Sequence, residues 1–426
     1  MKKMWRAPIG GAVMLAGLAI VGQAAAKQEP PSGLSASASF RSGVQQAQAS
    51  LKSGDVTGAG GQIAALNATN AFEKYLKASL SMELAVKRDD VVAQRKAIAD
   101  IIESGGAPQA QMGRLNHIAG FLSYQTGAID NAVLYLGRAR ELGVTDPKVA
   151  LLLSECYTRQ RKFNEAGKLL DDAIAQQKQS GQAVPPSWYD RAATIAIARR
   201  DWASLAAYNS ARLAGAPVSP PVWRSALTIY MENARPDKEA QLDLYRLQAA
   251  TAALASERDY QGYAALAATQ GYPAEAKSIL DAGISEGKLQ ATDPVVAPLM
   301  KTVKPRAVTF LASIKPLPGK AASASSGAKA EQDGDKLLAG AQFAEAVPFY
   351  RAALEKGTPD KDRTTARLGI ALARSGDFAG ARAALAQVSG NGSWSQVALF
   401  WSSWVDLRAA QASADAAPPA LTGGQS

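Results

Sequence analysis

The chain has very few side chains of the kinds that covalent or metal chemistry requires. Its 426 residues include one cysteine, Cys156, and one histidine, His117. A single thiol excludes an internal disulfide, and a single imidazole argues against multi-histidine metal sites and Ser-His-Asp catalysis. The adjacent carboxylates Asp89-Asp90 and Asp171-Asp172 point about 100° apart on a helix, which suits a solvated surface better than an acid/base pair. We therefore expect no enzyme, no metal and no cofactor.

The N-terminal residues have the three parts of a secretory signal peptide. Residues 2–6 carry three cations, residues 7–22 are apolar, and three alanines then offer a cleavage site. A membrane span needs about 20 apolar residues, so this shorter run favours a leader over residues 1–26, cut after Ala26. The alternative is an uncleaved anchor helix. The sequence has no later stretch apolar enough to span a bilayer, and it predicts a periplasmic or secreted protein.

The net charge of the chain indicates which classes of partner it could bind. The formal net charge is +10, and removing the three leader cations leaves a basic chain. A basic surface favours anionic partners such as acidic glycans, lipid headgroups or acidic protein faces, although solubility alone is the alternative explanation. Nucleic acid is not expected, because no basic motif interleaved with aromatic residues is present.

A period of 34 residues is the strongest structural signal in the chain. Gly120, Ile129, Ala132, Leu136 and Ala139 recur as Ser154, Phe163, Ala166, Leu170 and Ala173. The spacing predicts two antiparallel helices per unit, where the first small residue lets the helices approach and the other positions form a buried stripe. Near the C-terminus the pattern repeats at 35 residues in Gly334/Gly369, Phe343/Phe378, Ala346/Ala381 and Tyr350/Leu385. Glycines at 54, 127 and 376 suit the tight turns between the helices.

These residues resemble the tetratricopeptide repeat (TPR) family, whose units are helical hairpins. The best matches are 113–146, 147–180, 327–360 and 362–395, and weaker units fall near 40–73, 75–108, 186–219, 220–255 and 257–290. The resemblance implies an all-α solenoid of antiparallel helix pairs. It also implies a scaffold that binds other proteins.

In the family, the first helix of each unit lines a concave groove that holds a partner. The matching positions here are Arg114, His117, Phe121, Tyr124, Gln125, Lys148, Leu151, Glu155, Arg159, Arg363, Ile370 and Arg374. The resemblance implies that the aromatic side chains anchor a protein partner and that the cations pair with its anionic groups. A solvated polar surface is the alternative. The carboxylate clamp of chaperone-binding members is not matched, because His117, Phe121 and Leu152 occupy its positions.

An aromatic stripe follows the last repeat. Trp394, Val397, Trp401 and Trp404 are spaced so that all four lie on one helix face. We predict a capping helix laid on the last repeat, with an exposed binding face for a partner helix or a sugar as the alternative. We expect Cys156 to be a buried, inert thiol.

The composition predicts two arrays. Residues 313–330 are rich in Pro, Gly, Ser and Ala with three lysines and no acid, which is typical of a flexible linker. It would separate a TPR-like array over 38–312 from a two-repeat module with a closing helix over 331–410. Residues 27–37 and 411–426 are small and polar, so disorder is expected there.

Together these patterns indicate an exported, non-enzymatic scaffold that mediates protein–protein interactions in the bacterial cell envelope. The alternative is a periplasmic accessory factor for polysaccharide export or cell-wall assembly, which binds an acidic glycan or its machinery. Salt distinguishes the two, because binding through many charges weakens steeply with ionic strength and an aromatic groove is less affected.

Overall fold

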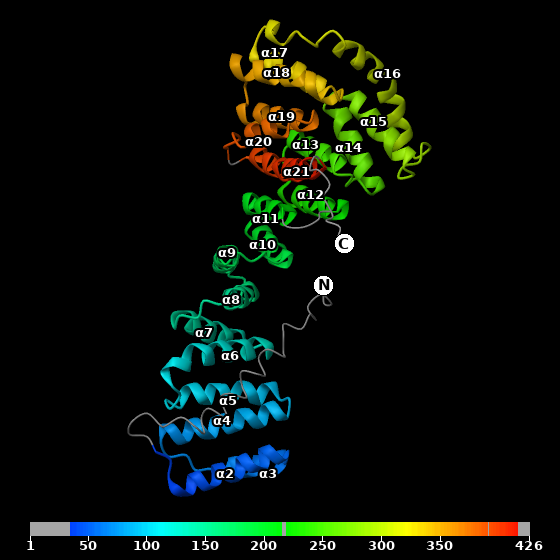
Figure 1. The fold of residues 1–426 in the computed structure, drawn as a ribbon. Helices are drawn as coiled ribbons and strands as arrows, with labels where there is room; N and C mark the ends of the chain where they lie inside the picture. The colour runs from blue at the N-terminus through cyan, green and yellow to red at the C-terminus, as the bar shows by residue number, and fades with distance from the viewer. Residues whose placement is uncertain (1–34, 215–218, 391, 416–426) are drawn as a thin grey trace, which may run out of the picture. The chain divides into compact units, whose positions relative to one another are not determined.

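A computed structural model describes residues 35–214, 219–390 and 392–415. Within these residues the protein is all-α, with twenty α-helices, two short 3-10 helices and no β-strand (Figure 1). The predicted leader and its cleavage site at Ala26 lie outside the described residues. The chain divides into two compact units, residues 1–182 and 183–426.

The first unit is a stack of helix pairs in which each helix contacts the helices next to it in sequence. Its helices are α2 (Ala38–Ser53), α3 (Val56–Ala65), α4 (Ala71–Lys87), α5 (Val91–Glu103), η1 (Gln109–Gln111), α6 (Met112–Gln125), α7 (Ile129–Glu141), α8 (Pro147–Arg159) and α9 (Phe163–Gln179). The units predicted at 113–146 and 147–180 match the pairs α6/α7 and α8/α9, and those near 40–73 and 75–108 overlap the pairs α2/α3 and α4/α5 with shifted bounds. The all-α hairpin prediction is confirmed.

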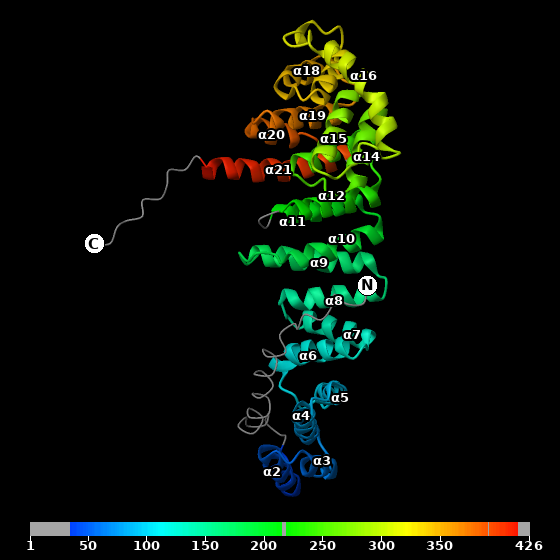
Figure 2. The same ribbon diagram turned by 90° about the vertical axis from the view of Figure 1, so that its right-hand side faces the viewer.

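The second unit begins with the same hairpins but ends differently. Its helices are α10 (Pro186–Arg199), α11 (Trp202–Ala214), α12 (Pro220–Ala234), α13 (Lys238–Ala250), α14 (Glu257–Thr269), α15 (Pro273–Ser285), α16 (Val296–Ile314), η2 (Ala321–Ser323), α17 (Gly327–Ala339), α18 (Phe343–Lys356), α19 (Lys361–Arg374), α20 (Phe378–Leu385) and α21 (Ser393–Asp415). The last helix, α21, packs against α19 and α20 and also against α11 and α13 (Figure 2). The last helix thus packs against helices that lie much earlier in the sequence.

The small residues of the repeat act as the period predicts. A Cβ added at Gly120 would lie 2.5 Å from Cγ of Leu136, and one at Gly369 would lie 2.5 Å from Cγ of Leu385. In the unit after Gly120, the Ser154 hydroxyl occupies this contact and donates to the Ala166 carbonyl at 2.6 Å. In these three hairpins the two helices therefore touch at this position.

The turns between the paired helices use left-handed backbone. Gly127 has φ of 77° and Gly376 has φ of 92°, a region that glycine enters without steric cost. In the next unit the position of Gly127 is occupied by Arg161, which has φ of 60°. The turn geometry is kept there in spite of the side chain.

The structure divides the chain at a different place from the predicted linker. The two compact units meet between Gln182 and Ala183, inside the predicted array 38–312. Residues 313–330 lie within the second unit and contain the end of α16, η2 and the start of α17. Ile314 and Ala321 are buried there. The segment has the composition of a linker, but these apolar side chains pack into the second unit. The flexibility of 313–330 stays a prediction.

Each of the two predicted disordered ends contains residues that the structure places next to or inside a helix. Ala36 is buried, and the Ser37 side chain caps α2 by accepting from the Phe40 amide. At the other end α21 continues to Asp415, past the predicted limit of 410. The remaining residues of 27–37 and 411–426 lie outside the described part of the chain.

Candidate functional site

The predicted groove residues of the first unit lie on α6 and α8. Arg114, Gln125, Lys148 and Arg159 are exposed, and His117, Phe121, Tyr124, Leu151 and Glu155 are half-buried. Their spacing of three and four residues places each set on one side of its helix. We call these nine residues the α6–α8 face.

A stacked pair joins the two helices of the α6–α8 face. The guanidinium carbon of Arg159 lies 4.3 Å from the centroid of the Tyr124 ring. Arg159 also donates to the Tyr124 hydroxyl at 2.8 Å, and its Nε lies 3.6 Å from the Glu155 carboxylate. Cation–π and hydrogen-bond contacts of this kind hold the guanidinium plane in one orientation, and the Arg159 side chain is still 44% exposed.

The other cations of the α6–α8 face have no carboxylate partner. Among the described residues, neither Arg114 nor Lys148 makes an ion pair. Burial lowers the pKa of His117, against the opposing effect of Asp146, and so favours the neutral imidazole. The face therefore offers fixed positive charge from Arg114, Lys148 and Arg159, with Glu155 as its one acid.

The groove residues predicted in the C-terminal repeats have other surroundings. Arg363 donates to Glu331 at 2.9 Å and to Glu239 at 2.7 Å. Arg374 is half-buried with its guanidinium carbon 4.4 Å from the Phe343 ring centroid, and burial lowers its pKa. Ile370 is buried. Within the second unit these side chains contact the chain itself, so they are not arranged as a free surface.

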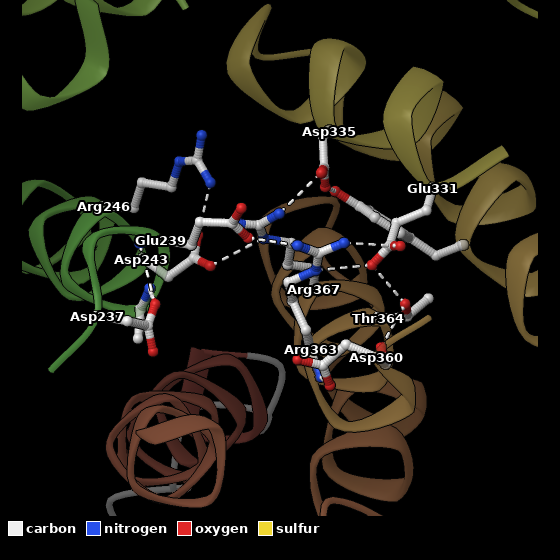
Figure 3. A network of polar contacts seen from close by, with 12 residues as sticks. Asp237, Glu239, Asp243, Arg246, Glu331, Asp335, Asp360, Arg363, Thr364 and Arg367 are labelled. Carbon is white, nitrogen blue, oxygen red and sulfur yellow. Dashed lines mark hydrogen bonds and ion pairs between the residues drawn. The ribbon is translucent and has the colours of Figure 1, made fainter. Parts of the chain in front are cut away.

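Arg363 belongs to a buried charge network that connects α13 with α17 and α19 (Figure 3). At its centre Arg367, only 1% exposed, donates to Asp243 at 3.0 Å and to Asp335 at 2.8 Å. On the far side of Asp243, Arg246 donates to this carboxylate at 2.5 Å. The Tyr350 hydroxyl donates to Asp335 at 2.8 Å. Each central carboxylate therefore has at least two donors.

The charged groups of this network shift one another's pKa values. Burial alone would lower the pKa of Arg367, but Asp335 and Asp243 raise it well above the ordinary arginine value. Burial raises the pKa of Asp335 although Arg367 opposes this. For Glu331, the effect of burial is outweighed by hydrogen bonds from Arg363 and Thr364, and its pKa is lowered. Removing one cation would leave buried carboxylates without compensation.

The tryptophan stripe completes the same core. Trp401 is fully buried, and its Nε1 donates to the Asp243 carbonyl at 3.1 Å. Trp394 is buried and lies under Arg367, whose guanidinium carbon is 5.3 Å from its ring centroid. Trp404 is half-buried, and its ring is nearly perpendicular to that of Trp401, with 5.4 Å between the two ring centroids. These contacts are those of a packed closing helix, and they reach α13 as well as the last repeat.

Sequence reasoning missed the network and one short motif. The pairs Asp243/Arg246 and Arg363/Arg367 have helical spacing, but this pattern is equally common on solvated helices. Residues 283–287 match Gly-x-Ser-x-Gly, the spacing of a hydrolase nucleophile elbow. Ser285 is however the last residue of α15, whereas the elbow requires a strand-to-helix turn.

Other chemistry finds no support in the part of the chain that the structure describes. No group of three or more His, Cys, Asp and Glu side chains there is arranged to hold a metal ion. Burial raises the pKa of the Cys156 thiol to about 12, so it is not a thiolate at neutral pH. None of the helices in these residues has both the length and the apolar character that crossing a membrane requires.

Comparison with known proteins finds loose similarities among solved structures. Neither protein-family profiles nor curated proteins give a match. Among solved structures the chain is similar to a tetratricopeptide repeat protein from Parabacteroides merdae, with 12% identity and a TM-score of 0.33 over 70% of this chain and 99% of that chain. It is also similar to the TPR2AB domain of yeast Sti1, solved in complex with pHSP90, at 17% identity and a TM-score of 0.26 over 69% and 99% of the two chains. Apo RapI is similar at 10% identity and a TM-score of 0.35 over 80% and 92%. These superpositions are loose, and the TPR-like repeat fold stands on the helix pairing and turn geometry within this chain.

Proposed function

We propose that this chain is an exported, non-enzymatic scaffold of the bacterial cell envelope that binds protein partners through the α6–α8 face. The contrast between the two units carries the proposal. Arg114, Lys148 and Arg159 are exposed, whereas Arg363 is paired with Glu331 and Glu239 inside the second unit. Exposed cations beside half-buried aromatic rings are suited to recognition rather than to packing.

The chemistry of the α6–α8 face favours an extended acidic segment of a partner protein. Phe121 and Tyr124 supply apolar contact area at low entropic cost. Arg114, Lys148 and Arg159 are placed around them to pair with carboxylates, and the planar guanidinium groups can do so with two hydrogen bonds each. The location in the envelope is supported by residues 1–26, whose charge and apolar pattern is that of a leader.

The test is affinity capture from the envelope fraction with residues 27–426, followed by affinity measurements with the captured protein. Phe121→Ala should weaken binding by at least about tenfold, since a central aromatic anchor typically contributes about 2 kcal/mol or more. Arg159→Ala should cause a smaller loss that grows at low salt. Lys168→Gln, an exposed change on α9, is the control and should leave affinity unchanged. Unchanged affinity in Phe121→Ala and in Arg114→Gln/Lys148→Gln would place the binding site outside the α6–α8 face.

An acidic glycan is the second candidate partner. Its support is the unpaired state of Arg114 and Lys148 in a chain of net charge +10. A polyanion held by charge alone should lose affinity steeply between low and physiological salt, and Phe121→Ala should not affect it. Binding of a protein anchored by aromatic rings should change less with salt, and Phe121→Ala should weaken it.

A further inference from the structure

Helix α16 and the residues that follow it form the most one-sidedly charged part of the chain. Between Asp293 and Glu331 the sequence has six basic residues and no acidic one. The surrounding helices do not neutralise this charge: of the six, Lys301, Lys304, Arg306, Lys315 and Lys320 make no ion pair among the described residues. All five of these are exposed.

The buried side of α16 fixes which side chains face outward. Val296, Val303, Ala307 and Ile314 are buried, and α16 packs mainly against α15. At about 100° per residue, Lys301, Lys304, Val308, Leu311 and Lys315 fall within about 80° of arc on another side of the helix. We call these five residues the α16 stripe.

The α16 stripe combines cations with exposed aliphatic side chains. Val308 is 69% exposed and Leu311 is 46% exposed, and Val308 has the highest exposed fraction among the exposed large apolar residues of the described chain. They lie between Lys304 and Lys315 along the helix. The stripe is therefore apolar in its middle and basic toward both ends, over about 21 Å of helix length.

We propose that the α16 stripe binds the surface of an anionic lipid membrane. Lysine side chains extend along a helix and place their ammonium groups among acidic headgroups, while short aliphatic side chains between them enter the boundary of the acyl region. The charge complementarity is strong because no carboxylate interrupts the segment. The proposal is independent of the α6–α8 face, since vesicle binding requires no protein partner.

The form of the stripe favours a bilayer over other polyanions. Helix α16 lies at the rim of the second unit in both views (Figures 1 and 2), and the five residues of the stripe are exposed. An acidic glycan would use the lysines but would gain nothing from Val308 and Leu311, because sugar rings stack on aromatic faces. An acidic polypeptide is the remaining competitor, and the experiment distinguishes it.

The experiment is co-sedimentation of residues 27–426 with vesicles, so that the apolar residues 7–22 cannot themselves insert. Vesicles of phosphatidylcholine and phosphatidylglycerol should bind the chain, and vesicles of phosphatidylcholine alone should not. Each lysine near an anionic surface contributes about fivefold in partitioning, so Lys301→Gln/Lys304→Gln/Lys315→Gln should weaken binding about a hundredfold. Val308→Ser/Leu311→Ser should weaken it about tenfold with the charge unchanged.

A matched variant removes the same charge elsewhere. Lys52, Lys168 and Lys361 are exposed on other helices, and their triple change to glutamine should reduce vesicle binding by less than about threefold. Equal losses in the two triple variants would show that net charge alone acts and would overturn the proposal. Binding to neutral vesicles as strong as to anionic ones would also overturn it. Binding of soluble poly-L-glutamate through the stripe, without vesicle binding, would assign it to an acidic polypeptide instead. Circular dichroism should show unchanged helix content in every variant.

Discussion

Arg159 in the first unit and Arg367 in the second both lie on the first helix of a repeat hairpin, but their surroundings are opposite. The Arg159 side chain is 44% exposed and stacks on Tyr124 of the preceding repeat. Arg367 is 1% exposed and is held by Asp243, 124 residues earlier in the chain. The same hairpin thus presents its first helix to solvent in one unit and covers it in the other.

The difference comes from long-range packing. In the first unit the helices contact sequence neighbours, so the first-helix positions of α6 and α8 stay open. In the second unit, α13 and α21 pack against α19, and the side chains expected to line a groove become parts of a core. A repeat pattern therefore identifies candidate binding positions, while contacts from distant helices decide which of them remain available.

The largest predicted effect tests the buried network. Arg367→Met should destabilise the second unit by about 3–5 kcal/mol, because Asp243 and Asp335 would stay buried with fewer donors. Apart from Trp5, every tryptophan of the chain lies in residues 183–426. Tryptophan fluorescence during urea unfolding of residues 27–426 therefore reports on the second unit alone.

The counterpart in the first unit is Arg159→Met, and its unfolding is measured by far-ultraviolet circular dichroism. Its cost should stay below about 1 kcal/mol, since an exposed cation–π pair contributes little to stability. Similar losses in the two variants would contradict the contrast between an open and a covered first helix.

A smaller effect should show whether the units unfold separately. Ala132 and Ala381 occupy the same repeat position in the two units and are both fully buried. Leucine at either site should overpack the helix contact and cost about 1–3 kcal/mol. Ala381→Leu should move the tryptophan transition, and Ala132→Leu should move only the transition seen by circular dichroism. A shift of the tryptophan signal by Ala132→Leu would show that the units unfold together.

A pH-dependent effect is expected at Glu73 in the first unit. Its carboxylate accepts from the amides of Ser37 at 2.9 Å and Thr69 at 2.8 Å and from the Thr69 hydroxyl at 2.8 Å. The hydrogen bond from Ser37, followed by those from Thr69, lowers the pKa of Glu73 from 4.5 to about 2. A lowered folded-state pKa stabilises the fold above the unfolded value, and the benefit disappears as the pH falls toward the folded value.

The midpoint of thermal unfolding should therefore separate wild type from Glu73→Gln at pH 7, and the separation should close between about pH 5 and pH 2. Glu165→Gln, on an exposed position of α9, is the control and should behave like wild type throughout. A separation that widens on acidification would have the wrong sign for this explanation.

The smallest effect compares equivalent turns. Arg161→Gly should be neutral or stabilising by less than about 1 kcal/mol, because relief of left-handed strain is partly offset by greater freedom of the unfolded chain. Gly127→Ala, at the same position of the preceding repeat, should destabilise by about 1 kcal/mol. Thermal midpoints that move in the same direction would mean that the two turns do not share one backbone requirement.

The helix pairs and their close contacts could be predicted because they depend on neighbouring residues. Gly120 and Leu136, or Gly369 and Leu385, are joined by one turn, and a period of 34 or 35 residues shows them directly. The 3.6-residue pattern also indicates which side of a helix is buried. It contains no information on which distant helix covers that side.

The missed features all depend on such distant partners. The position of Asp243 beside Arg367 and Trp401 requires α13 to meet α19 and α21, and the unit boundary near Gln182 follows from which helices make these contacts. The groove residues could be proposed on α6 and α8 from the TPR resemblance. The Tyr124–Arg159 stack could not, because it depends on the orientation of two side chains from different repeats.

The hydrogen bond from Trp401 to the Asp243 carbonyl spans 158 residues, and this has a consequence for synthesis. A ribosome adds residues at about 5–20 per second, so α13 emerges many seconds before α19 and α21. Helices of the first unit find their partners as they are made, since those partners are adjacent in sequence. The contacts of Asp243 with Arg367 and Trp401 cannot form until α19 and α21 have been made, and closing so long a loop slows folding. Nascent chains that stop before residue 393 should therefore carry a finished first unit and a second unit that is open to proteases.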